Sequence, residues 1–110
     1  MRITLPSGTS AEIVHHDSPV MGLVVAPDIF GLRPLYDDLV ARFSREWGMS
    51  VVAVEPFPGT ELGPDIDPRF AAVPALDDAK NLSDLLEAAD ALGTETVGLI
   101  GFCMGGMYCF

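Results

Sequence analysis

The residues that could carry chemistry in this chain gather around one cysteine near its end. Cys103 lies in the run Gly-Phe-Cys-Met-Gly-Gly at residues 101–106, directly after an apolar run typical of a strand. Gly-x-nucleophile-x-Gly is the spacing of a nucleophile elbow, in which a strand turns abruptly into a helix. The turn forces the central residue into a strained conformation, and Gly101, Gly105 and Gly106 leave room that side chains would fill. A thiol placed there projects beside the first amides of a helix, which favour a thiolate or an oxyanion.

Two other interpretations of this run are weaker. Cys103 could be a small buried apolar residue, with glycines that only permit close packing of helix on strand. The strand before it, the helix after it and the glycines on both sides favour the elbow. A dinucleotide loop is disfavoured because the glycines miss the Gly-x-Gly-x-x-Gly register, and no Gly-Lys-Ser/Thr follows for a phosphate loop.

A cysteine nucleophile needs a base, and neither His nor Asp follows Cys103. The two histidines, His15 and His16, come earlier on a predicted edge strand, and we interpret them as solvated. With Asp17 they form an adjacent trio whose side chains would point to different faces of a strand, so we expect no metal site. Cys109 is expected to pack in the helix behind the elbow. A disulfide to Cys103 would have to bridge a helical rise of about 9 Å, beyond the roughly 7 Å limit between bridged Cα atoms.

The elements that must position the elbow alternate between strands and helices. Residues 1–16 predict a hairpin, because apolar and polar residues alternate around a turn-rich segment. Two apolar runs predict strands buried on both faces, residues 20–26 and 49–54, and a last strand is predicted at 97–102. Apolar residues recur at helical spacing over two segments, 32–47 and about 73–92. The proline-rich segment 56–68 predicts a long loop, of the kind that is often functional or covers a site.

Each predicted helix has an apolar side and a polar side. On the first helix the apolar stripe is Leu35, Leu39, Phe43 and Trp47, widened by Tyr36 and Val40. On the second helix the apolar side is Leu76, Ala79, Leu82, Leu86 and Ala89. Four acidic residues lie mostly on the other side and are interpreted as a solvated face: Asp77, Asp78, Asp84 and Glu87.

This order of elements predicts an α/β fold in a single domain over residues 1–110. We expect a mostly parallel sheet with flanking helices and an antiparallel hairpin at its N-terminal edge. Ligands in such folds bind beyond the carboxyl ends of the strands. Two segments would meet at that edge: residues 27–31, Pro-Asp-Ile-Phe-Gly, and residues 101–106.

The charge and the composition of the chain argue against nucleic acids and membranes as its partners. Six basic residues against 16 acidic ones give a net charge of −10, which would repel the phosphates of nucleic acids and anionic lipids. Two cysteines make no disulfide framework. No apolar run reaches the roughly 20 residues of a membrane span, and the first residues contain no secretory signal. We therefore expect a soluble, cytoplasmic chain that acts on a small molecule; its oligomeric state is left open.

The two segments at the carboxyl edge, in this order of elements, resemble the dienelactone hydrolase family of the α/β-hydrolase fold. The resemblance spans essentially the whole chain. It implies that Cys103 attacks an ester or lactone carbonyl and that the amides of Ile29 and Met104 form the oxyanion hole. It also implies that an Asp and a His beyond residue 110 complete the triad, in a domain of about twice this length. The apolar ending of the sequence likewise predicts a piece of a larger domain. No cofactor is implied.

The position of Asp28 departs from the family pattern. The family has Glu there, a carboxylate that holds the resting thiol and is displaced when substrate binds. Asp28 could play that part in the site, although it is one methylene shorter. Alternatively, it starts the loop by accepting hydrogen bonds from nearby amides. Both interpretations stay open at this stage.

The leading hypothesis is a hydrolase of small ester or lactone bonds that forms a thioester on Cys103. A second hypothesis is a non-catalytic acidic α/β module that pairs its open sheet edge with a partner. A third is a thiol redox sensor, because an exposed cysteine at a helix start is oxidisable. Without a base, the 110-residue chain alone is expected to be inactive, and its uncovered last strand is expected to favour aggregation.

Overall fold

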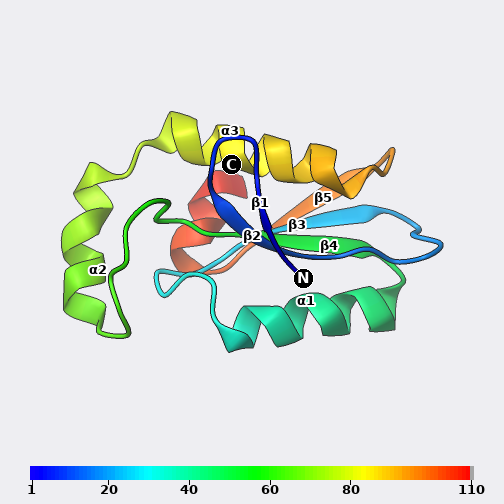
Figure 1. Cartoon of the computed structure of the whole chain (residues 1–110), viewed down its shortest axis with the longest axis horizontal. Coiled ribbons are helices and arrows are strands. Elements are labelled where there is room, and N and C mark those ends of the chain that lie inside the picture. The colour runs from blue at the N-terminus through cyan, green and yellow to red at the C-terminus, as the bar shows by residue number, and fades with distance from the viewer. Residues whose placement is uncertain (110) are drawn as a thin grey trace.

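The apolar runs assemble into one five-stranded sheet, seen in a computed structural model that describes residues 1–109 (Figure 1). The strands are β1 (Arg2–Thr4), β2 (Ser10–Val14), β3 (Gly22–Ala26), β4 (Ser50–Val54) and β5 (Val97–Gly101), in the spatial order β1-β2-β4-β3-β5. The pairings β1–β2 and β2–β4 are antiparallel, whereas β3 pairs parallel with β4 and with β5. The α/β fold and the N-terminal hairpin are thus confirmed. The sheet is mixed, since the hairpin brings two antiparallel ladders.

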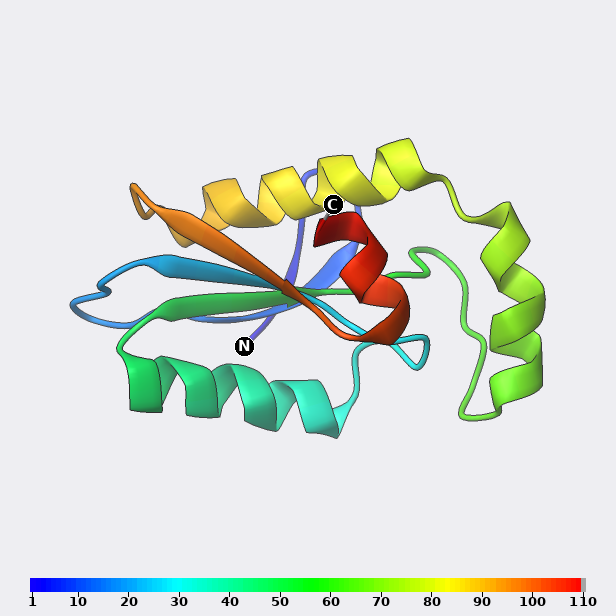
Figure 2. The same cartoon turned by 180° about the vertical axis from the view of Figure 1, so that it is seen from behind.

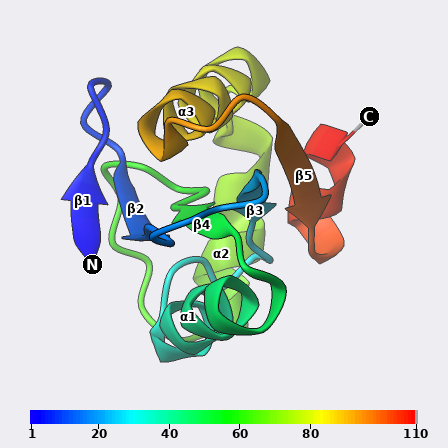
Figure 3. The ribbon, with the colours of Figure 1, turned by 90° about the vertical axis from the view of Figure 1, so that its right-hand side faces the viewer.

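Two long helices cover opposite faces of this sheet (Figure 3). They are α1 (Pro34–Trp47) and α3 (Asp78–Leu92). Pro34 starts α1, where its missing N–H is no loss, and Gly48 ends it at a left-handed φ of 66°. Asp77 caps α3 by accepting a hydrogen bond from the Lys80 amide at 3.2 Å. Among residues 1–109, no helix combines the length and apolarity that crossing a membrane requires.

A short additional helix, α2 (Ile66–Ala72), begins inside the segment 56–68 that was predicted to be a loop and continues beyond it, and a 3-10 turn over Val73–Ala75 follows. The prediction of one helix starting near residue 73 was therefore wrong, because α3 begins at Asp78. Pro68 obscures the helical pattern of α2 in the sequence. It is tolerated because it lies in the first turn, where an N–H has no helical partner.

The core has two parts, one on each face of the sheet, because successive strand residues point to opposite sides. Toward α3 it comprises Leu5, Ala11, Ile13, Val24, Val52, Val54, Ala88 and Leu92. Toward α1 it comprises Leu23, Val25, Tyr36, Val40, Met49, Val51 and Ala53. The central strands β3 and β4 are buried along their whole length, which anchors the carboxyl edge where the candidate site lies.

The face that α1 buries is rotated from the predicted stripe. Its fully buried residues are Tyr36, Val40 and Ser44. Leu35 and Trp47, predicted to be core residues, are 53% and 52% exposed. Trp47 instead stacks on Phe43, with ring centroids 4.3 Å apart. The pattern in the sequence is wide enough to allow either face, and the contact with the sheet selects the one centred on Tyr36 and Val40.

β5 is the last strand in the sheet order, and within residues 1–109 no strand pairs with its outer edge, as predicted from the sequence. Apolar side chains of α3 and β5 are exposed beside it: Leu82, Leu86, Val97 and Leu99. They belong to the lining of an open groove of about 490 Å³. The predicted apolar side of α3 is therefore only partly buried in the described structure. An open strand edge next to apolar side chains is a template for association.

Candidate active site

The chain turns sharply after β5, and the turn is strained at Cys103. Its φ of +52° makes it the only non-glycine residue with positive φ among residues 1–109. This left-handed conformation costs about 1–2 kcal/mol for a residue with a Cβ, so the surrounding structure must impose it. A 3-10 helix, η2 (Cys103–Cys109), begins at the same residue, and Cys103 is exposed. Strand, strained residue and helix follow one another in the arrangement of an elbow.

Two glycines allow the turn to close. A Cβ on Gly105 would lie 2.1 Å from the Ala26 carbonyl oxygen and 2.4 Å from that of Pro27. A Cβ on Gly101 would lie 2.5 Å from the Cα of Gly106. Gly106 itself has no such constraint, because the nearest atom to its Cβ would be 3.8 Å away. The elbow thus requires glycine at 101 and 105, whereas Gly106 matters as the surface on which Gly101 packs.

The elbow lies directly against the loop that follows β3 (Figure 2). The Phe102 amide donates a hydrogen bond to the Ala26 carbonyl at 3.0 Å, which ties the end of β5 to the end of β3. Because Gly105 also packs on the carbonyl groups of Ala26 and Pro27, the start of η2 and the start of this loop share one surface. The two segments that the sequence placed at the carboxyl edge are therefore neighbours in space.

Most main-chain amides of the loop that follows β3 donate a hydrogen bond. Four of them donate hydrogen bonds of 3.2 Å or less: Asp28 to the Tyr36 hydroxyl, Phe30 to the Asp28 carboxylate, Gly31 to the Asp28 carbonyl, and Leu32 to the Glu55 carboxylate. Pro27 has no N–H. The Ile29 amide is the exception, since it donates no hydrogen bond within the described structure. Among the amides of residues 28–32, only that of Ile29 therefore has no acceptor within residues 1–109 and is available to a ligand.

The amide of Met104 also has no hydrogen-bond acceptor among residues 1–109, and the same holds for the amide of Cys103. On either side of these two residues, Phe102 and Gly105 donate to carbonyl groups. Met104 immediately follows the strained Cys103 and lies in the first turn of η2, where N–H groups point away from the helix. The resemblance implied that the amides of Ile29 and Met104 form an oxyanion hole, and neither N–H group has a hydrogen-bond acceptor among residues 1–109.

Asp28 does not bind the elbow thiol in this structure. The carboxylate accepts hydrogen bonds from both terminal nitrogens of Arg33, at 2.8 and 3.1 Å, and from the Phe30 amide at 3.2 Å. Burial alone would raise the pKa of Asp28, but Arg33, the Phe30 amide and the Tyr36 hydroxyl outweigh it and hold the pKa below its usual range. Of the two interpretations that the sequence left open, the structure shows the hydrogen bond to a nearby amide.

A second arginine approaches the same loop from α2. Arg69 donates to the carbonyl of Ile29 at 3.0 Å and to that of Gly63 at 2.8 Å, and its guanidinium lies 5.9 Å from the Phe30 ring centre. Together with Arg33 it contributes to an open groove of about 520 Å³, lined by Phe30, Leu32, Arg33, Gly63, Pro64 and Arg69. Since α2 buries none of its residues, Arg69 is its main polar link to the site.

The histidines lie away from the elbow. His15 and His16 directly follow β2, whose last residue, Val14, pairs with Val51 near the start of β4, at the sheet edge opposite to Cys103. His16 accepts a hydrogen bond from the Ser18 amide at 3.0 Å. Within residues 1–109 no group of three or more potential ligand residues is placed to hold a metal ion.

Both cysteines are free thiols. Cys109 is exposed, so the expectation that it packs behind the elbow was wrong. The reason is that η2 buries only Gly105, and the rest of this short helix extends past the sheet.

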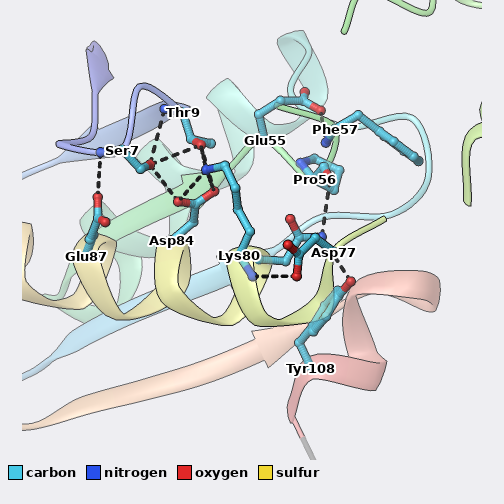
Figure 4. Close-up of polar contacts among 11 residues, drawn as sticks. Ser7, Thr9, Glu55, Pro56, Phe57, Asp77, Lys80, Asp84, Glu87 and Tyr108 are labelled. Atoms are coloured by element: carbon cyan, nitrogen blue, oxygen red, sulfur yellow. Dashed lines mark hydrogen bonds and ion pairs between the residues drawn. The ribbon is translucent and has the colours of Figure 1, made fainter. Parts of the chain in front are cut away.

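A polar cluster behind the elbow was missed in the sequence (Figure 4). Asp84, assigned to a solvated face of α3, is 1% exposed. Its carboxylate accepts hydrogen bonds from the hydroxyls of Ser7 at 2.6 Å and Thr9 at 2.7 Å, and from the Lys80 ammonium at 3.1 Å. Burial would raise the pKa of Asp84, but these three groups together hold it below its usual range. The cluster fastens the turn of the N-terminal hairpin to α3.

The same side of α3 holds the elbow helix. Asn81 donates hydrogen bonds to the Tyr108 hydroxyl at 2.9 Å and to the Pro56 carbonyl at 3.3 Å, and the Tyr108 hydroxyl donates to Asp78 at 3.0 Å. A small cavity of about 20 Å³ lies between this link and the ends of β3 and β4. It has room for about one water molecule, so the elbow is backed by closely packed structure.

Removing the buried charge of this cluster should destabilise the fold. We expect Asp84→Asn to lower the free energy of unfolding by about 3 kcal/mol, because one buried acceptor oxygen becomes an NH2 group and the Lys80 ammonium loses its charged partner. Since the pKa of Asp84 is lower in the folded state than in the unfolded state, its contribution is present above the unfolded value of about 3.9 and is lost as the pH falls through the folded value.

Denaturant unfolding of both proteins at several pH values measures this effect. The difference between wild type and Asp84→Asn should be constant near neutrality and shrink below about pH 4. Asp90→Asn, at an exposed position of the same helix, is the matched control, expected within about 0.5 kcal/mol of wild type. Equal stability of Asp84→Asn and Asp90→Asn would contradict the structural role of the cluster.

The site residues missed in the sequence are Arg33, Tyr36 as a hydrogen-bonding group, Glu55 and Arg69. A signal was available only for Glu55, which directly follows a buried strand at the carboxyl edge. Tyr36 and Arg69 belong to helices and Arg33 directly precedes α1, so their approach to the loop depends on how each helix packs.

Comparison with known proteins tests the fold. No family model and no curated protein matches the chain. Among solved structures, a protein assigned as a dienelactone hydrolase from Klebsiella pneumoniae subsp. pneumoniae is 24% identical, with a TM-score of 0.78 over 96% of this chain and 50% of its own. A dienelactone hydrolase-like promiscuous phosphotriesterase from metagenomic libraries is 23% identical, with a TM-score of 0.70 over 99% of this chain and 51% of its own. The chain therefore has the α/β-hydrolase fold of dienelactone hydrolase-like proteins and spans about half the length of those that it matches.

Proposed function

We propose that this chain carries the nucleophile and the oxyanion hole of a hydrolase that cleaves small ester or lactone bonds. The observation that carries the proposal is the pairing of an exposed thiol on a strained elbow with two free main-chain N–H groups, those of Ile29 and Met104. Strain of this kind is typical of functional sites, and free amides beside a nucleophile are the donors that acyl transfer requires. The shared fold with dienelactone hydrolase-like proteins supports the same reading.

The reaction would proceed in two halves. The Cys103 thiolate attacks the carbonyl carbon, and the carbonyl oxygen becomes an oxyanion that accepts hydrogen bonds from Ile29 and Met104. Collapse of this intermediate breaks the bond to the leaving oxygen, which takes up a proton, and leaves a thioester on Cys103. Water then attacks the thioester, and the thiol and a carboxylic acid are released. No cofactor or metal takes part in this scheme.

The base that deprotonates the thiol and activates the water is proposed to lie in the protein beyond residue 110, as an Asp–His pair. The side chains of residues 1–109 do not supply it, since both histidines lie at the opposite sheet edge and Asp28 is paired with Arg33. Without this base, the 110-residue chain by itself is expected to show no catalytic turnover, even with a reactive ester. A reducing compartment such as the cytoplasm would keep Cys103 and Cys109 as thiols.

Trapping of the acyl intermediate tests the proposal. Full-length protein mixed with p-nitrophenyl acetate should release a burst of nitrophenol, and mass spectrometry of the digested protein should find an acetyl group on Cys103. Cys109→Ser, which keeps the elbow and removes the other exposed thiol, should give the same burst and adduct. Acetylation of Cys109 alone, or a burst that survives Cys103→Ala, would refute the assignment. Oxidation of Cys103 by peroxide without any acyl transfer would favour the redox sensor instead.

A further inference from the structure

Both oxygens of the Asp28 carboxylate, in the loop beside the elbow, accept hydrogen bonds from one arginine side chain. Arg33 donates hydrogen bonds from both terminal nitrogens to the Asp28 carboxylate and a further one to the Gly31 carbonyl at 3.1 Å. Its guanidinium also lies over two aromatic rings, 5.4 Å from the centre of Phe30 and 5.2 Å from that of Tyr36. A two-pronged ion pair between aromatic rings holds both partners in one geometry.

This pair and Tyr36 constrain the loop at every residue around Ile29. The Tyr36 hydroxyl accepts from the Asp28 amide before Ile29, and the Asp28 carboxylate accepts from the Phe30 amide after it. Arg33 binds the Gly31 carbonyl one residue further along. The Ile29 amide is left free because its neighbours on both sides are held by other partners.

We propose that Arg33 is a positioning residue that draws the Asp28 carboxylate away from the thiol and uses it to hold the Ile29 N–H open to the developing oxyanion. This inference rests on the proposed function. It assigns to Asp28 a task different from that of the glutamate in the family pattern, namely framing the oxyanion loop. It also implies that no carboxylate binds the Cys103 thiol in the resting state, so substrate has none to displace.

Kinetics of the full-length protein test the positioning role. We expect Arg33→Gln to lower kcat about 10-fold or more with little change in KM, because an oxyanion donor contributes about 10²–10³-fold and a misaligned donor loses part of that. Arg33→Lys should recover part of the loss, since it keeps the charge without the two-pronged geometry. Arg42→Gln removes an exposed arginine of α1, the helix that directly follows Arg33, with its nearest acidic partners 4.0 Å away, and should behave as wild type. Unchanged kcat in Arg33→Gln, or a loss confined to KM, would overturn the role.

A second measurement needs no catalysis. In a Cys109→Ser background, the rate of Cys103 alkylation by iodoacetamide is followed against pH in the protein with the Asp28–Arg33 pair and in Asp28→Asn/Arg33→Gln, which removes the carboxylate without leaving an unpaired cation. We expect the midpoint of the profile to stay the same, because the carboxylate is paired with Arg33. A carboxylate resting on the thiol would disfavour the thiolate, so its removal would lower the midpoint, and that result would overturn the inference.

The two tests separate the possible failures. If Cys103→Ala kept its turnover, the proposed function would fall, and with it the need for an oxyanion donor at Ile29. If Cys103→Ala lost turnover and Arg33→Gln did not, the proposed function would stand and only the positioning role of Arg33 would be wrong. Circular dichroism of Arg33→Gln and Arg33→Lys checks that both variants are folded.

Discussion

Cys103→Ala in the full-length protein should lower kcat/KM for an activated ester by at least about three orders of magnitude, which corresponds to about 4 kcal/mol of lost transition-state stabilisation. The variant removes the sulfur atom that forms the thioester and leaves both proposed oxyanion donors in place. The residual rate would come from those donors and from substrate binding. Initial rates of p-nitrophenyl acetate hydrolysis measure the effect, and Cys109→Ala, which removes the other exposed thiol, should retain the wild-type rate.

The same position offers a separate test of strain. Alanine has a Cβ like cysteine, so Cys103→Ala should leave the stability almost unchanged. Cys103→Gly removes the Cβ at a φ of +52°, and it should raise the free energy of unfolding by about 1 kcal/mol. A rise in the stability of Cys103→Gly would show that the elbow stores backbone strain at the position of the nucleophile. Undiminished hydrolysis by Cys103→Ala would exclude the thiol from the mechanism.

Gly105→Ala should disrupt the elbow itself. The new Cβ would lie 2.1 Å from one main-chain oxygen and 2.4 Å from another, both at the end of the buried strand β3. Because main chain in the centre of a sheet cannot move aside as a flexible side chain can, we expect a loss of about 3 kcal/mol in the free energy of unfolding. Turnover should fall even under conditions where the variant is folded, since η2 and the Met104 amide must shift away from Ile29.

Gly106→Ala is the matched control for this prediction. It makes the same change one residue later, where the nearest atom to the new Cβ would be 3.8 Å away. In a helical segment, alanine in place of glycine is neutral or slightly stabilising. Denaturant unfolding and ester hydrolysis should therefore distinguish the two variants clearly. Equal behaviour of Gly105→Ala and Gly106→Ala would mean that the turn is not closed in the way described.

Much of the fold could be predicted because it depends on local patterns. The runs around residues 22–26 and 50–54 are too uniformly apolar to be anything other than buried strands, and Pro34 and Gly48 mark the ends of α1. The helix α2 could not be predicted in the same way. Pro68, in the first turn of α2, is a residue that usually interrupts a helix. None of the residues of α2 is buried, so no apolar stripe marks this helix in the sequence.

The faces of helices were predicted less well, for a related reason. Asp84 was assigned to solvent because aspartate is seldom buried without a partner. Its partners Ser7 and Thr9 come from the hairpin turn, more than 70 residues away in the sequence, and only the packing of that turn on α3 brings them together. Leu35 and Trp47 fit the apolar period of α1, yet the contact with the sheet leaves them half-exposed.

The order of strands and helices and the place of Cys103 on a turn flanked by glycines could be inferred from the sequence, because they follow from periodicity, turn chemistry and the space that a side chain occupies. Three other features became visible only in the folded chain: Asp28 pairs with Arg33, the amides of Ile29 and Met104 have no acceptor among residues 1–109, and Asp84 is buried. Hydrogen-bond partners and exposure depend on which segments meet in space. A pattern along one segment does not specify its neighbours.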